Sequence, residues 1–182
     1  MHNLLAILRF RFMVAVFRLR DWWRPRREVL QEVGIRPGFR ILDYGCGTGS
    51  YIRDSARLAG ESGQVYALDI NPLAIEAAKQ IAAAYGLRNV KTILSDCATG
   101  LSDESIDVVL LYDVFHALAR PHDVMAELHR VLQPKGALSF SDHHLSEKTI
   151  MTRVSKEGLF ILIDKGRNTY HFEKQIIDLH HE

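Results

Sequence analysis

One stretch decides the fold of this 182-residue chain: Ile41-Leu42-Asp43-Tyr44-Gly45-Cys46-Gly47-Thr48-Gly49-Ser50. Apolar residues lead into an acid, and three glycines then follow at alternate positions. This pattern predicts a buried strand that ends in a turn almost free of side chains. Glycine permits positive φ and lets a ligand approach the bare backbone. A helix predicted from about Gly49 would point its free N–H groups at that ligand.

The glycine spacing separates two kinds of ligand-binding loop. In the dinucleotide fingerprint G-x-G-x-x-G the third glycine packs the helix on the strand, but Ser50 stands at that position here. The stretch instead reads D-x-G-x-G-x-G. It resembles motif I of the class I S-adenosylmethionine-dependent methyltransferases, of the small UbiE or methyltransferase-11-like type. The alternative is a purely structural strand-to-helix turn, and the rest of the chain has to decide between the two.

Strand and helix patterns alternate along the chain. Short apolar runs predict strands at 64–69, 89–96, 106–113 and 137–141. Helices are predicted at 28–33, 49–59, 72–85, around 124–132 and at 146–156. Two last strands, 159–164 and 170–174, form a predicted hairpin.

This alternation predicts an α/β fold with a doubly wound, mostly parallel sheet. The resemblance covers about residues 26–175. It implies a seven-stranded sheet that ends in an antiparallel hairpin, which is the Rossmann-like methyltransferase fold.

The resemblance also implies that S-adenosylmethionine binds at the carboxyl ends of the strands, where ligands bind in such sheets. Asp69 ends the second strand, and it is expected to accept hydrogen bonds from the ribose. Ile70 would pack on adenine, Asp96 would accept the adenine amino group, and the N–H of Cys97 would meet the ring. An aspartate at a strand end can also be a capping or turn residue, so its position counts for more than its type. The predicted cofactor-binding residues are Asp43, Gly45, Gly47, Gly49, Asp69, Ile70, Asp96, Cys97 and Tyr112.

Candidate catalytic residues follow the fourth and fifth strands. A methyltransferase aligns a nucleophile behind the sulfonium methyl group and, for some acceptors, removes a proton. His116 follows the fourth strand, and His143 and His144 follow the fifth. Because adjacent residues of a strand point opposite ways, only one of His143 and His144 is expected to face the pocket. The predicted catalytic residues are His116, His144 and Tyr112, and no metal is predicted. The alternatives are a metal site formed with Asp113, or histidines that only meet solvent.

A small or amphipathic acceptor is expected, because the chain has no inserted substrate domain. Residues 111–114 read Leu-Tyr-Asp-Val and not Asn/Asp-Pro-Pro-Tyr, which argues against methylation of adenine or glutamine nitrogens. Two other functions stay open. One is a nucleic-acid methyltransferase recruited by amino-terminal arginines, whose binding would weaken steeply with salt. The other is a non-catalytic S-adenosylmethionine-binding module.

The amino-terminal segment differs from the rest of the chain in charge. Residues 1–27 contain seven arginines and one acid, a net charge of +6 that leaves −5 for the remainder of a chain of net charge +1. Aliphatic residues surround these arginines, which makes nucleic acid an unlikely partner. Arginines interrupt the apolar run, which argues against a transmembrane helix, and the pattern of a signal peptide is absent.

We therefore expect three parts of the chain. Residues 1–25 form a helical lid, or a segment that contacts a membrane surface or a second copy of the chain. Residues 26–176 form the methyltransferase domain, and residues 177–182 form a tail. Cys46 and Cys97, without a C-x-x-C pattern, predict a reduced, cytoplasmic protein, with peripheral membrane contact as an alternative.

Overall fold

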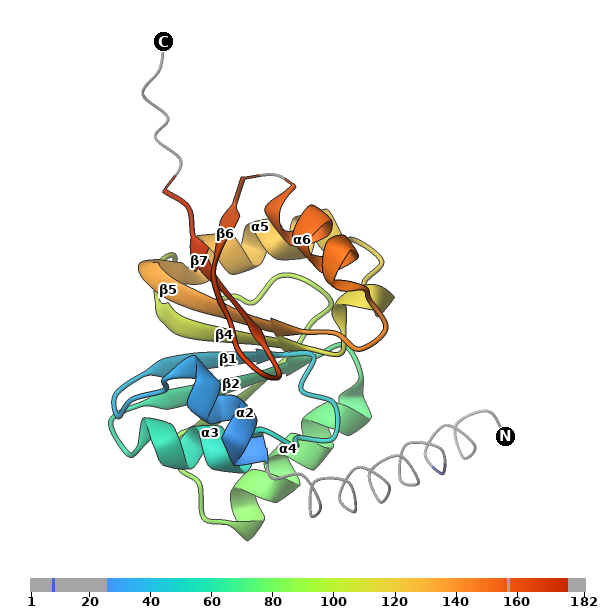
Figure 1. Ribbon diagram of the computed structural model, residues 1–182. Coiled ribbons are helices and arrows are strands. Elements are labelled where there is room, and N and C mark those ends of the chain that lie inside the picture. Colours follow the sequence, from blue (N-terminus) through green and yellow to red (C-terminus); the bar gives the residue numbers. More distant parts are fainter. Residues whose placement is uncertain (1–7, 9–25, 157, 177–182) are drawn as a thin grey trace.

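The computed structural model of the chain describes residue 8, residues 26–156 and residues 158–176 (Figure 1). The predicted amino-terminal lid and the predicted tail therefore lie outside the described residues, apart from residue 8. Within the described part of the chain, no helix is long and apolar enough to cross a membrane.

The described elements alternate as predicted. In chain order they are α2 (Arg26–Val33), β1 (Arg40–Tyr44), α3 (Ile52–Ala59), β2 (Gln64–Asp69), α4 (Pro72–Ala84), β3 (Val90–Leu94), β4 (Ile106–Tyr112), the short 3₁₀ helix η1 (Phe115–Ala117), α5 (Pro121–Val131), β5 (Leu132–Ser141), α6 (Glu147–Ser155), β6 (Phe160–Lys165) and β7 (Tyr170–Lys174). The strands form one seven-stranded sheet in the order β3-β2-β1-β4-β5-β7-β6. Strands β1 to β5 are parallel, whereas β7 is antiparallel to β5 and to β6. The predicted fold class is confirmed.

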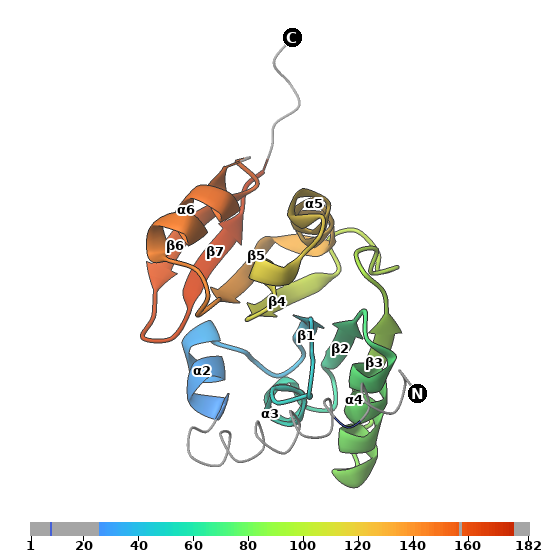
Figure 2. The same ribbon diagram turned by 90° about the vertical axis from the view of Figure 1, so that its right-hand side faces the viewer.

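Helices cover both faces of the sheet (Figure 2). Helices α2, α3 and α4 lie on one face, where Leu30 and Ala56 pack with Ile41 of β1. Helices α5 and α6 lie on the other face, where Leu128 packs in one cluster with Leu42 of β1. Ile41 and Leu42 are both 0% exposed. Burial of adjacent strand residues explains why these strands read as continuous apolar runs.

Helix α4 begins at Pro72 as predicted, whereas two other boundaries differ from the prediction. Asn71 caps α4 by accepting the N–H of Leu73 at 3.0 Å, with Pro72 in the first turn as predicted. Helix α3 begins at Ile52 and not at Gly49, whose φ of 78° is left-handed. Strand β5 begins at Leu132, five residues earlier than predicted.

The early start of β5 comes from an interrupted register. Ile106 pairs with Leu132, but Val108 pairs with Ala137, so residues 133–136 bulge out of the pairing. The strand therefore contains an irregular bulge at residues 133–136, opposite the single residue Asp107.

Tyr85 directly follows α4 and lies at the surface. This side chain is 51% exposed. Its ring lies 5.3 Å from the guanidinium of Arg53 and 5.7 Å from that of Arg57, both on α3. Two cation–π contacts satisfy the ring at the surface.

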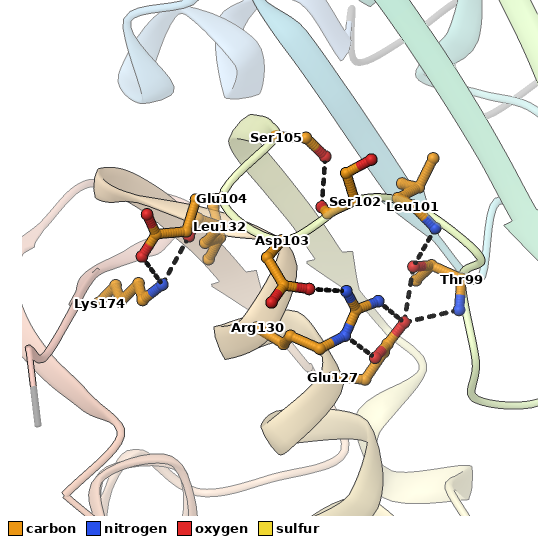
Figure 3. Close-up of polar contacts among 10 residues, drawn as sticks. All are labelled: Thr99, Leu101, Ser102, Asp103, Glu104, Ser105, Glu127, Arg130, Leu132 and Lys174. Carbon is orange, nitrogen blue, oxygen red and sulfur yellow. Dashed lines mark hydrogen bonds and ion pairs between the residues drawn. The ribbon is translucent and has the colours of Figure 1, made fainter. Parts of the chain in front are cut away.

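A charged network ties the segment before β4 to α5 (Figure 3). The carboxylate of Glu127 accepts the N–H of Thr99 at 2.8 Å and its hydroxyl at 2.6 Å. Arg130 donates to both oxygens of Glu127 at 2.8 Å and also pairs with Asp103. Arg130 and the Thr99 donors outweigh the burial of Glu127 and lower its pKa to about 2. The network thus anchors residues 99–103 on the helix.

Replacing Glu127 by Gln should lower the free energy of unfolding at neutral pH by about 1–3 kcal/mol, because Arg130 loses its charged partner. A folded pKa of about 2 against the ordinary 4.5 means that this contribution is complete above pH 4.5 and disappears as the pH falls toward 2. Urea unfolding across this window should show a smaller loss of stability for the variant than for the wild type. Glu61→Gln, at an exposed position, is the control. Equal pH slopes for Glu127→Gln and wild type would contradict the assignment.

Candidate active site at the carboxyl edge of the sheet

An aspartate stands at or just after the end of each parallel strand. Asp43 and Asp69 lie in β1 and β2, Asp96 lies two residues after β3, and Asp113 and Asp142 directly follow β4 and β5. Because the carboxyl ends of parallel strands meet at one edge of a sheet, these carboxylates gather there. Such an edge suits a ligand that carries positive charge and hydrogen-bond donors.

The glycine loop after β1 is held by backbone hydrogen bonds and kept open by its middle glycine. Gly45, Gly47 and Gly49 all have positive φ, of 76°, 50° and 78°. A Cβ on Gly45 would lie 2.7 Å from Val114, and one on Gly49 would lie 2.5 Å from Ile81, so both are required by packing. A Cβ on Gly47 would meet nothing nearer than a carbonyl oxygen at 3.9 Å. Gly47 is thus the position where bare backbone faces open space.

Asp43 lies buried beneath this loop with an unused hydrogen-bonding atom. Its residue is 3% exposed, and among the described residues Oδ2 has no hydrogen-bond partner. Burial, and then the nearby carboxylate of Asp69, raise its pKa to about 7. A buried acceptor without a partner, beside a glycine loop, fits a ligand that brings a donor or a positive charge.

Asp69 connects the glycine loop to α4. Its Oδ2 accepts the N–H of Gly47 at 2.9 Å, and its Oδ1 accepts the N–H of Asn71 at 2.8 Å. Each carboxylate oxygen can accept a second hydrogen bond, so the residue can still serve a ribose. The ribose contact therefore stays a prediction, and the structure adds a loop-anchoring role.

Replacing Asp69 by Ala should weaken the binding of S-adenosylhomocysteine by about tenfold to a hundredfold, because charged hydrogen bonds are lost. Isothermal titration calorimetry measures this. The control is Asp107→Ala: Asp107 also accepts a backbone N–H, from Arg40 at 2.7 Å, but at the start of β1, on the opposite edge of the sheet. Unchanged affinity in a folded Asp69→Ala variant would remove the ribose assignment.

The residues predicted around adenine lie at the ends of β2 and β3. Ile70 is 68% exposed, which leaves its apolar surface available to a ligand. Asp96 is also exposed, and its carboxylate pairs with Arg120. Cys97 is partly buried, and this burial raises the pKa of its thiol. The structure leaves their cofactor contacts as predictions, and it adds Arg120, which the sequence did not single out.

The structure contradicts the catalytic role predicted for Tyr112. The residue is 7% exposed, and its hydroxyl bonds to Oγ of Ser139 at 2.7 Å. Its ring packs against that of Tyr51, with centroids 4.8 Å apart. Burial also raises its pKa well above the ordinary value. The predicted contact between its backbone and the cofactor does not depend on the side chain and stays a prediction.

His116 and Asp142 form an imidazole–carboxylate pair across the ends of β4 and β5. The ring Nδ1 of His116 lies 2.9 Å from Oδ2 of Asp142, whose side chain is 0% exposed. Burial of Asp142 would raise its pKa, but the N–H groups of His116 and His144 and the imidazole outweigh burial and hold the pKa below its usual value. The ionised carboxylate is an acceptor, so Nδ1 carries the proton. The lone pair of His116 is then on Nε2, where a base needs it.

A second imidazole–carboxylate pair joins the same two strand ends, with the histidine after β5 and the aspartate after β4. Nδ1 of His143, after β5, lies 2.7 Å from Oδ1 of Asp113, after β4. Asp113 has a φ of 54°, an uncommon conformation for a residue other than glycine. The ring of His144 lies between the other two imidazoles, with centroids 4.0 Å from His143 and 4.1 Å from His116.

The strand alternation that was expected to separate His143 from His144 does not apply, and which of them faces the pocket stays a prediction. Strand β5 ends at Ser141, so both residues lie in a turn, where side chains do not alternate. The three imidazoles form one cluster in which neighbouring rings are tilted by 39° and 45°. Among residues 26–156 and 158–176, no group of three or more histidine, cysteine, aspartate or glutamate side chains is arranged to hold a metal ion.

Asp142 is the functional candidate that sequence reasoning missed. It precedes two histidines and directly follows the apolar strand β5. The available signal was an acid at a strand end, the same signal that selected Asp69 and Asp96. Its partner His116 is 26 residues away in sequence, so only the fold shows the pair.

Comparisons with known proteins agree with this geometry. A family described as "Methyltransferase domain" matches residues 35–176. O-methyltransferase 3 of Dictyostelium discoideum is 30% identical over 150 residues, which cover 75% of this chain and 34% of that protein. Demethylmenaquinone methyltransferase of Geobacillus stearothermophilus is 30% identical over 125 residues, covering 68% of this chain and 53% of that protein. The chain thus spans about a third to a half of the length of these relatives.

Solved structures show the same fold. A SAM-dependent methyltransferase from Aquifex aeolicus superposes with a TM-score of 0.72 at 23% sequence identity, covering 88% of this chain and 97% of that one. At this identity the likeness concerns the fold alone.

Proposed function

Because the chain belongs to the class I S-adenosylmethionine-dependent methyltransferases, we propose that it methylates a small or amphipathic acceptor whose proton is removed by His116. The observation that carries this proposal is the pair of His116 with the buried carboxylate of Asp142. The same segment packs on the glycine loop, since a Cβ on Gly45 would collide with Val114, two residues before His116. The base therefore stands beside the predicted cofactor site.

The residues present fit the family's cofactor. S-adenosylmethionine supplies, when bound, a methyl group activated on a positively charged sulfur. The open backbone at Gly47 and the unpartnered Oδ2 of Asp43 offer it space and a hydrogen-bond acceptor. Asp69 and Asp96 would hold the nucleoside, with Ile70 against its base.

The chain's own chemistry is proton removal. Nε2 of His116 would take the proton from the acceptor atom, and the ionised Asp142 would stabilise the imidazolium that forms. Asp142 also accepts the backbone N–H of His116 at 2.9 Å and that of His144 at 3.1 Å, so it holds both loops in place. Because this carboxylate is buried and already oriented, it does not have to reorganise when the positive charge develops on the imidazole.

One relative supports an amphipathic acceptor, because its name denotes a demethylmenaquinone methyltransferase. The nucleic-acid alternative depends on arginines that lie mostly outside the described residues, and the structure offers it no separate support. The non-catalytic alternative is weakened by an imidazole–carboxylate pair placed beside the glycine loop.

One assay separates these functions. The purified chain is incubated with S-adenosylmethionine and, in turn, catechols, hydroquinones, thiophenols and total RNA, and the release of S-adenosylhomocysteine is measured. We expect release with one of the small-molecule classes. Release with RNA alone, weakening steeply with salt, would support the nucleic-acid function. If the chain binds the cofactor but releases no S-adenosylhomocysteine with any of these acceptors, the proposed methylation of such acceptors is contradicted.

A further inference from the structure

A salt bridge reaches the predicted adenine site from a residue outside the predicted cofactor set. Arg120 directly precedes α5, and its Nη2 donates to Oδ2 of Asp96 at 2.8 Å. The bridge links the segment after β3 to the segment after β4. The side chains are 55% and 58% exposed, so both remain accessible to a ligand.

The bridge commits one oxygen of Asp96 and leaves the other available. Among the described residues, no group is seen to donate to Oδ1 of Asp96. The backbone at this point is also held, because the hydroxyl of the buried Tyr44 donates to the carbonyl oxygen of Asp96 at 2.9 Å. A fixed main chain and a half-committed carboxylate leave Oδ1 as the acceptor that a ligand would meet.

The neighbouring donor is only weakly engaged. The N–H of Cys97 lies 3.3 Å from Oγ of Ser95, at the long end of the hydrogen-bond range. It can therefore be exchanged for a ring nitrogen of a ligand. An available acceptor beside an exchangeable donor matches the amino edge of adenine, which offers one donor and one acceptor.

We propose that Arg120 is a positioning residue that orients Asp96 to recognise the amino group of adenine; the proposal rests on the cofactor role given to Asp96. An exposed aspartate without a partner samples several rotamers and loses that freedom on binding. The guanidinium, with its donors in a rigid planar fork, holds the carboxylate before the cofactor arrives. Asp123 supports Arg120 from α5, with its Oδ2 3.6 Å from Nη1.

Orientation of Asp96 also gives specificity. With Oδ1 directed at the ring edge, an amino group donates to it. An oxo-purine presents a carbonyl oxygen at the same place, and two acceptors then face each other without a proton between them. Arg120 therefore increases discrimination between amino- and oxo-purines. Stabilising the fold is a weaker account of the bridge, because exposed ion pairs contribute little to stability.

Calorimetry with S-adenosylhomocysteine and S-inosylhomocysteine tests the proposal in the full-length chain. Arg120→Ala should weaken the adenosyl ligand by about threefold to tenfold and leave the inosyl ligand nearly unchanged, so that the ratio of affinities falls. Arg120→Lys, which keeps the charge without the planar fork, should recover only part of the ratio. Lys165→Ala is the control, because Lys165 forms a similarly exposed pair with Glu147 and its removal should change neither affinity.

The Asp96→Asn variant separates this proposal from the assignment on which it rests. It should lose discrimination, and adding Arg120→Ala should then change the ratio no further. If Asp96→Asn keeps full discrimination, the adenine assignment of Asp96 is wrong. Arg120 has no positioning role if Asp96→Asn loses discrimination but Arg120→Ala does not. An Arg120→Ala variant that binds both ligands more weakly by the same factor would count as such a result, because the ratio of affinities is unchanged.

Discussion

His116→Ala is expected to lower turnover by about 10²- to 10⁴-fold while sparing the affinity for S-adenosylhomocysteine. Among the described residues, its imidazole is the only one that is paired with a buried carboxylate. Its removal takes away the proton acceptor but touches no predicted cofactor contact. Steady-state kinetics with an acceptor found in the assay above, together with calorimetry, measures both quantities.

The loss of turnover in His116→Ala is to be compared with the losses in variants of the other histidines. His143 is paired with Asp113, but their side chains are 67% and 35% exposed, so water competes for both. The ring of His144 contacts the two neighbouring imidazoles at a tilt, and it has no hydrogen-bond partner among the described residues. We therefore expect smaller losses for His143→Ala and His144→Ala. The control is His129→Ala on α5, whose ring contacts Gln175 and Phe160 and which should leave turnover unchanged. Near-normal turnover in all three cluster variants would reject base catalysis and favour an acceptor that is already deprotonated, such as a thiolate.

Gly47→Val is expected to weaken cofactor binding by more than about a hundredfold, because a branched side chain would fill the space left for the ligand. The position has a φ of 50° and no atom within 3.9 Å of an added Cβ. A valine there clashes with nothing in the protein itself, but it occupies the surface that the loop presents. Calorimetry with S-adenosylhomocysteine and a thermal melt of the same sample measure the affinity and the stability.

Backbone strain has to be separated from ligand exclusion. Valine resists positive φ at any position. Gly34 offers the matched control: its φ is 69°, an added Cβ would meet nothing within 4 Å, and it follows α2, outside the glycine loop. Gly34→Val should lose similar stability yet keep its affinity. A Gly47→Val variant that melts much lower than Gly34→Val but still binds would show that this glycine is structural.

Much of the fold could be predicted from local patterns. The alternation of apolar runs and helix signals led to the right sheet class, and Asn71 with Pro72 marked a helix start correctly. Burial on both faces of β4 was visible as an unbroken apolar run. The glycine spacing, with the acid at 69, identified the family. Each of these signals is local, because it depends on backbone propensity or on side chains within a few residues of one another.

The pairs in the site could not be predicted in this way. Asp142 meets His116, and Arg120 meets Asp96, only because parallel strands bring their ends to one edge; the sequence separations are 26 and 24 residues. Tyr112 was expected to face the acceptor, but the register of β4 turns its ring into the core against Tyr51.

The sequence by itself therefore determined the fold class, the family and which strand ends carry polar groups. The tertiary structure decided which of those groups pair, which stay open to a ligand and which are buried. The physical reason is that hydrogen bonding and burial depend on distances between segments far apart in the chain. A residue's own type and its neighbours do not specify those distances.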